Sequence, residues 1–301
     1  MVMHVKEPMP PEYDFIREDQ IIFTYLHLAA GEELTRTLIQ RGSVNIAYET
    51  IQKADGSLPL LIPMSEVAGR MAIQQGAKYL EMAQGGHGIL LGGVPGVDPG
   101  MVLIIGGGVV GINAAKTACG LGAKVCILDV NLDRLRYLSD VLPHNCFILM
   151  STPAAIRELI TRADVVVGAV LIAGSRAPKL VTEEMVKTMK KGAVLVDVSI
   201  DQGGCFETSR ETTHADPIYI LYDIVHYAVS NMPGVVPRTS TIALTNSTLP
   251  YVLDIANKGW QRAVMESSEI KYGVNVAKGK VTCIGVAQAF DLPCSPIEQL
   301  R

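Results

Sequence analysis

Hydrophobic and polar positions alternate along the middle of the chain in a pattern that predicts strands separated by helices. Short, continuously apolar runs predict strands at residues 101–106, 123–129, 145–150, 164–170 and 193–198. Helical patterns lie between them, at about residues 109–120, 131–140, 153–161 and 182–189. Strands without a polar face are typical of parallel sheets covered on both sides. We therefore expect an α/β fold with a doubly wound parallel sheet.

The flanking segments predict a second, discontinuous α/β domain. An apolar run at residues 21–28 and a short strand at 44–48 lie before the regular alternation. The tail predicts a helix at residues 250–265, followed by charged, irregular segments. Helices near residues 65–82 and from about 240 would connect the two domains. We expect a substrate domain made of residues 1–59 and 238–301, and a nucleotide-binding domain over residues 60–237.

A glycine motif follows the first strand of the alternation. Gly106, Gly108 and Gly111 have the spacing G-x-G-x-x-G and open a helix, and Asp129 ends the next strand, 23 residues after Gly106. Such glycines permit a tight turn, close approach of a pyrophosphate and close helix packing. An acid at the position of Asp129 accepts hydrogen bonds from the adenosine ribose, which favours NAD over NADP. The pattern predicts a Rossmann domain that binds NAD; the alternative is a glycine-rich turn that only packs.

Composition restricts the function further. The chain has 301 residues, of which 49% are hydrophobic and 19% charged, with a net charge of −4 that argues against a nucleic-acid surface. No apolar run reaches the length of about 18 residues that a membrane span needs, and the first residues lack the apolar region of a signal peptide. Six cysteines without metal-ligand spacing are typical of reduced, buried thiols. We expect a cytoplasmic protein without a metal site.

Four residues could take part in chemistry, and each has an ordinary structural explanation. His27 ends an apolar run, where histidine is more often structural, and Lys6 lies beside Glu7, as in a solvated surface pair. Asp201 follows the strand at 193–198, so it is either a site residue or a turn cap. Ser65 is either a helix N-cap or a phosphate contact.

Taken together, motifs along the whole chain resemble the alanine dehydrogenase family. They are Val5-Lys6-Glu7-Pro8, Leu26-His27-Leu28-Ala29-Ala30, Ala47-Tyr48-Glu49-Thr50, the segments 63–70, 92–97 and 177–181, Asp201-Gln202-Gly203-Gly204-Cys205-Phe206-Glu207, and Asn231-Met232-Pro233. The related proton-translocating transhydrogenase α subunit shares the Rossmann core and a similar Asp-Gln-Gly-Gly. Cys205-Phe206-Glu207 and the context of His27 favour the dehydrogenase.

The resemblance implies roles for individual residues. Lys6 would bind the substrate carboxylate, His27 would polarise the keto oxygen and exchange a proton, and Asp201 would assist the proton and water steps near the nicotinamide. The implied cofactor contacts are Ser65, Gly106, Gly108, Val109, Val110, Gly111, Asp129, Arg134, Ser151, Val170, Leu171, Val198, Ser199, Ile200, Asp201, Arg210, Val229, Ser230, Asn231 and Met232. The implied reaction converts L-alanine, water and NAD⁺ to pyruvate, ammonia and NADH in a homo-oligomer, with a hexamer as the family's assembly.

One departure from the family pattern concerns the start of the chain. Family members carry an additional β/α segment before the Val-Lys-Glu-Pro motif, with an arginine that grips the substrate carboxylate, whereas Met1 lies five residues before Lys6. We therefore expect an exposed sheet edge and weakened activity, unless another cation such as Arg70 or Lys179 serves. The alternatives are a non-catalytic NAD-binding remnant and a nucleotide-binding subunit of the transhydrogenase type.

Overall fold

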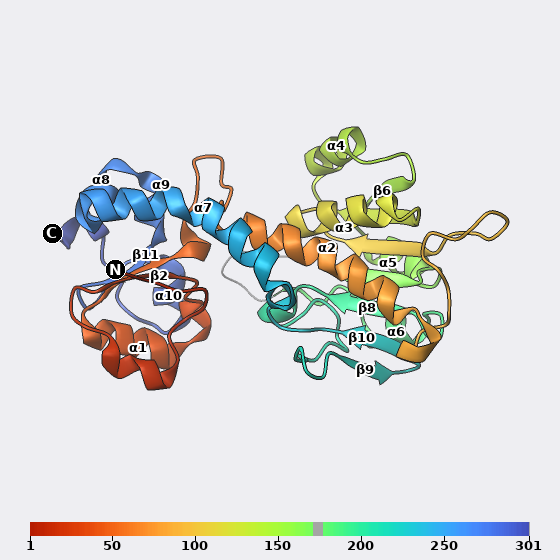
Figure 1. The fold of residues 1–301 in the computed structure, drawn as a ribbon, viewed down its shortest axis with the longest axis horizontal. Coiled ribbons are helices and arrows are strands. Elements are labelled where there is room, and N and C mark those ends of the chain that lie inside the picture. Colours follow the sequence, from red (N-terminus) through yellow and green to blue (C-terminus); the bar gives the residue numbers. More distant parts are fainter. Residues whose placement is uncertain (171–176, 301) are drawn as a thin grey trace. The chain divides into compact units, whose positions relative to one another are not determined.

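The computed structural model describes residues 1–170 and 177–300, and it divides the chain into two compact units (Figure 1). The smaller unit consists of Met1–Pro63 and Thr241–Arg301, and the larger one of Met64–Ser240. The boundaries fall within helices α2 (Ile62–Tyr79) and α7 (Pro237–Lys258). Each unit has its own sheet and its own core, so each is described by itself.

The larger unit is built on a seven-stranded sheet with the order β6-β5-β4-β7-β8-β10-β9. Its strands are β4 (Met101–Ile105), β5 (Lys124–Asp129), β6 (Cys146–Met150), β7 (Val165–Gly168), β8 (Val194–Asp197), β9 (Ile218–Leu221) and β10 (Ile224–Tyr227). All neighbours pair in parallel except β9, which is antiparallel to β10. The parallel strands have the Rossmann order, which confirms the predicted fold class.

Helices cover both faces of this sheet. They are α2, α3 (Val109–Gly120), α4 (Leu132–Val141), α5 (Pro153–Ile160) and α6 (Glu183–Lys187). Val102 and Ile104 of β4 share one buried cluster with residues of α2 and α3, whereas Leu103 shares another with residues of α5 and α6. Since successive side chains of a strand point to opposite faces, β4 is buried on both sides, as its uninterrupted apolar run predicts.

The smaller unit contains a five-stranded sheet with the order β1-β2-β3-β11-β12. Its strands are β1 (Val2–Met3), β2 (Ile21–Thr24), β3 (Val44–Ala47), β11 (Val274–Ala277) and β12 (Lys280–Val281), and its other helices are α1 (Glu32–Arg41), α8 (Trp260–Glu266), α9 (Ser268–Gly273) and α10 (Ile284–Ala289). The first three strands are parallel, and β11 is antiparallel to both β3 and β12. Segments from both ends of the chain therefore form one sheet.

The expectations for the tail were wrong in two respects. The helix expected at residues 250–265 is two helices, because α7 begins at Pro237, continues through Pro250 and ends before Gly259, whose φ of 75° suits glycine. The expected irregular segment contains α9, β11, β12 and α10. The strand pattern of β11 is hidden by Asn275, which is only 2% exposed and whose amide donates to Thr50 Oγ1 and to the Gly273 carbonyl at 2.6 and 2.9 Å.

Candidate functional site

The glycine turn after β4 leaves open space where a phosphate group would approach. At Gly106, with φ 108°, a Cβ would lie 2.5 Å from the Ala169 carbonyl oxygen. At Gly111 it would lie 1.9 Å from the Gly106 carbonyl oxygen, so α3 packs against the turn more closely than any side chain allows. At Gly108, the N-cap of α3, a Cβ would meet nothing within 4 Å, and no side chain caps the helix. The turn therefore fits a pyrophosphate held by backbone N–H groups.

Asp129 and Arg134 hold this turn from two sides. The half-buried carboxylate of Asp129 accepts hydrogen bonds from the N–H groups of Gly107 and Asn131, at 2.7 and 2.8 Å. The guanidinium of Arg134 donates to the carbonyl oxygens of Gly107 and Gly108. Both charges therefore fix the conformation of the turn, and Asp129 also lies at the carboxyl end of β5, where a ribose hydroxyl is expected in a Rossmann fold.

Three loops meet at the carboxyl ends of β7, β8 and β10. The Ser199 hydroxyl donates to the Val170 carbonyl at 2.7 Å and accepts from the Val170 N–H at 3.2 Å. The exposed Asp201 carboxylate accepts from the Ser230 hydroxyl at 2.7 Å and the Asn231 N–H at 3.2 Å. The fold therefore brings these predicted positions together, while Leu171 lies outside the described residues.

The other predicted cofactor contacts lie in various environments. Ser65 lies inside α2, which begins at Ile62, so its interpretation as an N-cap was wrong. The Ser151 N–H donates to the Asp129 carbonyl at 2.9 Å, directly after β6. The guanidinium of the exposed Arg210 stacks on the Tyr219 ring, with its Cζ 4.2 Å from the ring centroid. Ile200, Val229 and Met232 are buried, at 7%, 0% and 2% exposed, so they belong to the core beside the site.

The smaller unit holds the other predicted residues. His27 follows β2 with φ 48°, and its side chain is 45% exposed. Its Nδ1 lies 3.2 Å from Oε2 of Glu7, and the same oxygen lies 3.7 Å from Nζ of Lys6. Glu49 accepts hydrogen bonds from the backbone N–H groups of His27 and Leu26, at 2.6 and 3.1 Å. One carboxylate therefore orients the imidazole and another holds its backbone.

Glu7 determines the charge state of the imidazole. The hydrogen bond to His27 lowers the pKa of Glu7 to about 2, with a smaller contribution from Lys6. The same hydrogen bond raises the pKa of His27 and outweighs the opposing effect of burial. With its Nδ1–H directed at Glu7, the ring presents Nε2 as the nitrogen that can exchange a proton. The sequence analysis did not identify Glu7 and Glu49 as partners of His27, although both lie within motifs that it quoted.

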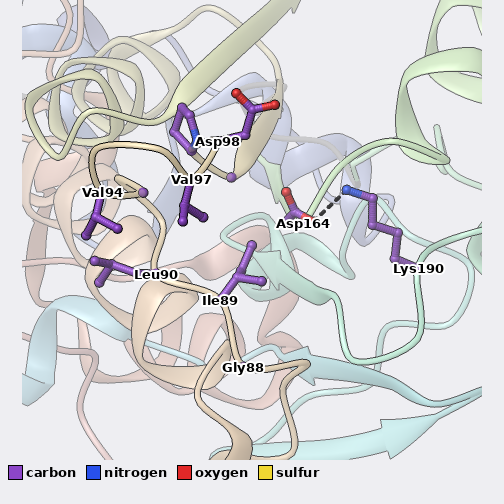
Figure 2. A pocket seen from close by; sticks show the side chains of 11 residues that line it. Gly88, Ile89, Leu90, Val94, Val97, Asp98, Asp164 and Lys190 are labelled. Carbon is purple, nitrogen blue, oxygen red and sulfur yellow. Dashed lines mark hydrogen bonds and ion pairs between the residues drawn. The ribbon is translucent and has the colours of Figure 1, made fainter.

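One surface hollow lies away from this chemistry, at residues 88–100, Asp164 and Lys190. Figure 2 shows its lining, which encloses about 350 Å³ between the loop of residues 88–100 and the ion pair of Asp164 and Lys190, whose Oδ1 and Nζ are 2.7 Å apart. Asp164 also accepts from the N–H of Met101, the first residue of β4. The hollow therefore lies at the amino ends of the strands, opposite the glycine turn, and Asp164 acts as an anchor for the sheet.

Within residues 1–170 and 177–300, no three His, Cys, Asp or Glu side chains are grouped so that they could hold a metal ion. No helix of that part of the chain is both long and apolar enough to traverse a bilayer.

The Rossmann sheet, the open glycine turn and its acid define a dinucleotide-binding α/β protein. The chain belongs to the alanine dehydrogenase/PNT family: the model of the N-terminal domain matches residues 1–68, and that of the C-terminal domain matches residues 72–284. The resemblance inferred from the sequence motifs is therefore confirmed.

Several known proteins are similar over almost the whole chain. An alanine dehydrogenase of Methanococcus maripaludis is 57% identical over 99% of this chain and 80% of its own length. Alanine dehydrogenase 2 of Staphylococcus aureus strain USA300 is 55% identical over 99% of this chain and 81% of its own length. A solved L-alanine dehydrogenase matches with a TM-score of 0.92 and 51% identity, over 96% of this chain and 80% of that one. A transhydrogenase from Sinorhizobium meliloti, at 20% identity and a TM-score of 0.78, shares the fold.

Proposed function

We propose that this protein is an NAD-dependent alanine dehydrogenase, which interconverts L-alanine, water and NAD⁺ with pyruvate, ammonia and NADH. The observation that carries the proposal is the identity of 55–57% to alanine dehydrogenases over 99% of the chain. The site residues agree with it, since a cation, an imidazole and a carboxylate are available as Lys6, His27 and Asp201. No finding favours the transhydrogenase-type subunit or the non-catalytic remnant.

The larger unit would hold the cofactor. The backbone of the turn at Gly106, Gly108 and Gly111 would bind the pyrophosphate, and Asp129 would accept hydrogen bonds from the adenosine ribose. When bound, the nicotinamide supplies the hydride chemistry of the reaction. Arg134, which could attract a 2′-phosphate, already donates to two carbonyl oxygens of the turn, so Asp129 decides the preference for NAD. The remaining cofactor contacts, from Ser65 to Met232, are proposed because the family resemblance implies them.

The smaller unit would hold the substrate. Lys6 would bind the carboxylate of alanine or pyruvate as a point charge. The neutral imidazole of His27 would accept a proton from the attacking water or the developing hydroxyl group, and the imidazolium would return it in the reverse reaction. Asp201 of the larger unit would assist the proton and water steps. Assembly into a homo-oligomer, with a hexamer as the family's form, and a cytoplasmic location, which free cysteines favour, are further parts of the proposal.

A direct assay tests the activity. The purified chain is mixed with L-alanine and NAD⁺, and the absorbance of NADH is followed; the reverse reaction is measured with pyruvate, ammonia and NADH. We expect turnover in both directions. If neither direction proceeds while NAD binds normally, the chain is the non-catalytic NAD-binding protein that the sequence analysis left open.

Cofactor selectivity is expected to depend on Asp129. Asp129→Ala should weaken NAD binding by about 1–3 kcal/mol, because a charge-assisted hydrogen bond to the ribose is lost. Binding of NADP should not weaken, since the repulsion of its 2′-phosphate disappears as well. Calorimetric titration of the parent and the variant with both nucleotides measures this. Asp133→Ala, on the exposed surface of α4, is the matched control; equal affinities of the parent chain for NAD and NADP would contradict the assignment.

The pH dependence is expected to follow Glu7. Because Glu7 raises the pKa of His27, Glu7→Gln should lower that pKa. Alanine oxidation needs the neutral imidazole, so the acid limb of its kcat/KM profile should move to lower pH. Pyruvate reduction needs the imidazolium, so its activity should decline at lower pH than in the parent. Glu33→Gln, on the exposed start of α1, is the control; unchanged profiles in Glu7→Gln would rule out this coupling.

A further inference from the structure

The loop after β8 is wrapped around one buried carboxylate. Asp197, the last residue of β8, is only 1% exposed. Its oxygens accept hydrogen bonds from the N–H groups of Ser199 at 3.0 Å, Cys205 at 2.9 Å and Phe206 at 3.4 Å, and from the Ser209 hydroxyl at 2.5 Å. Burial raises the pKa of the Asp197 carboxyl, and these hydrogen bonds oppose that rise. The three N–H groups can only donate, so they require acceptor oxygens, which a carboxylate supplies.

A lysine binds carbonyl oxygens of the same loop. Nζ of Lys179 donates to the carbonyl oxygens of Gly203 and Phe206, at 2.6 and 3.0 Å. Phe206 therefore has its N–H directed at an anion and its carbonyl at a cation. Charge-assisted hydrogen bonds are roughly twice as strong as neutral ones, so the pair fixes the loop in one conformation. Lys179 is thereby committed to the loop rather than to a substrate carboxylate.

The two glycines of the loop make this wrapping feasible. Gly203 and Gly204 have φ values of 89° and 74°, which other residues rarely adopt. At Gly204 a Cβ would lie 2.7 Å from Oδ2 of Asp197. The backbone can therefore approach the buried carboxylate only where no side chain intervenes. The loop is built around Asp197.

This loop carries groups that the proposed mechanism uses. Asp201 lies between Ser199, which fastens the loop to Val170, and the segment held by Asp197 and Lys179. The side chain of Asp201 is exposed, and within the described residues its hydrogen bonds reach Ser230 and Asn231. The position of its carboxylate therefore depends on the conformation of its own loop as well as on these two hydrogen bonds.

We propose that Asp197 and Lys179 are positioning residues, a charged clamp that fixes the loop bearing Asp201 for turnover. The inference rests on the proposed function, in which Asp201 assists the proton and water steps. A small displacement of a reacting group lowers the rate strongly, by about 100-fold for 1 Å. The clamp acts on one loop at the carboxyl end of β8, so its loss should leave the adenosine-binding half of the Rossmann unit intact.

The test uses Lys179→Met, with Lys179→Arg as the conservative variant and Lys191→Met, whose side chain is 85% exposed, as the matched control. Hydrogen exchange of the amides of Cys205 and Phe206, the affinity for ADP-ribose and steady-state kinetics are measured on the full chain. For Lys179→Met we expect faster exchange in this loop, about a 10- to 100-fold lower kcat at saturating substrates and unchanged ADP-ribose affinity. Lys179→Arg should recover part of kcat, and Lys191→Met should match the parent.

Three outcomes would overturn the clamp: unchanged loop exchange in Lys179→Met, faster exchange with parental kcat, or a parallel loss of kcat and ADP-ribose affinity that arginine does not rescue. Asp197→Asn should act in the same direction, and Lys179→Met keeps the test valid if that variant does not fold. A chain that never oxidises alanine refutes the proposed function, and the exchange measurement still shows whether the clamp holds the loop. Parental kcat in Asp201→Asn would refute the role of Asp201 and, with it, the purpose of the clamp.

Discussion

His27→Ala is expected to lower kcat for alanine oxidation by about two to four orders of magnitude, the usual contribution of general acid–base catalysis. The imidazole is held by Glu7 at 3.2 Å and is the proposed proton acceptor, whereas the glycine turn that would bind NAD lies in the other unit. The affinity for NAD should therefore be unchanged. Initial rates of NADH formation and calorimetric titration with NAD measure the two quantities separately.

A second variant separates the ring from the backbone. His27 has a left-handed backbone conformation, with φ 48°, which alanine adopts less readily than asparagine. His27→Asn should keep this conformation and lose the same activity, and His144→Ala, an exposed histidine before β6, should behave like the parent. Parental turnover in both His27 variants would show that the imidazole is structural, as its place at the end of an apolar run first suggested.

The elements of the larger unit were predictable because their signals are local. The strand expected at residues 101–106 is β4 (Met101–Ile105), and the one expected at 164–170 is β7 (Val165–Gly168). Both are continuous apolar runs, and the glycine turn after β4 follows from residues adjacent in sequence. No long-range information is needed to locate them. The glycine turn between β4 and α3 was therefore located from the sequence.

The partners of His27 were not predictable in the same way. Glu7 and Glu49 lie 20 and 22 residues away from it in sequence. They meet it because β1 and β3 both pair in parallel with β2, with Met3 opposite Phe23 and Ala47 opposite Thr24, so that the residues following the three strands gather at one edge. Sequence neighbours alone paired Glu7 with Lys6 as a surface contact, which misses its hydrogen bond to the imidazole. The register of the sheet is the missing information.

One arrangement recurs at two loops that follow strands. The N–H of Gly107 is bound by Asp129 and its carbonyl by Arg134, just as the N–H of Phe206 is bound by Asp197 and its carbonyl by Lys179. In each case a carboxylate accepts a hydrogen bond from the N–H of one residue, and a cation donates a hydrogen bond to the carbonyl oxygen of the same residue. Each loop then has a fixed conformation before any ligand arrives, and a ligand that binds such a loop does not have to order it. Two acids that end strands, Asp129 and Asp197, therefore hold the backbone of loops here.

Alanine substitutions at Gly111 and at Gly108 are expected to have different effects on stability and on NAD binding. In Gly111→Ala the new Cβ would lie 1.9 Å from the Gly106 carbonyl oxygen, so the free energy of unfolding should fall by about 3 kcal/mol or more, as overpacking of a close contact requires. In Gly108→Ala the new Cβ meets no atom of the described residues within 4 Å, so the fold should stay as stable as the parent. The methyl group would nevertheless occupy the space where the pyrophosphate approaches, so NAD binding should weaken by at least about tenfold, which corresponds to about 1.4 kcal/mol.

Urea unfolding and calorimetric titration with NAD distinguish the two effects, and Gly120→Ala, at the other end of α3, is the matched control because its Cβ also meets nothing within 4 Å. Gly120→Ala should keep both stability and NAD affinity. Parental NAD affinity in a stable Gly108→Ala variant would mean that the pyrophosphate does not pass this turn. Parental stability in Gly111→Ala would mean that α3 can move away from the turn, and the close packing of helix and turn would then not be the reason for a glycine at this position.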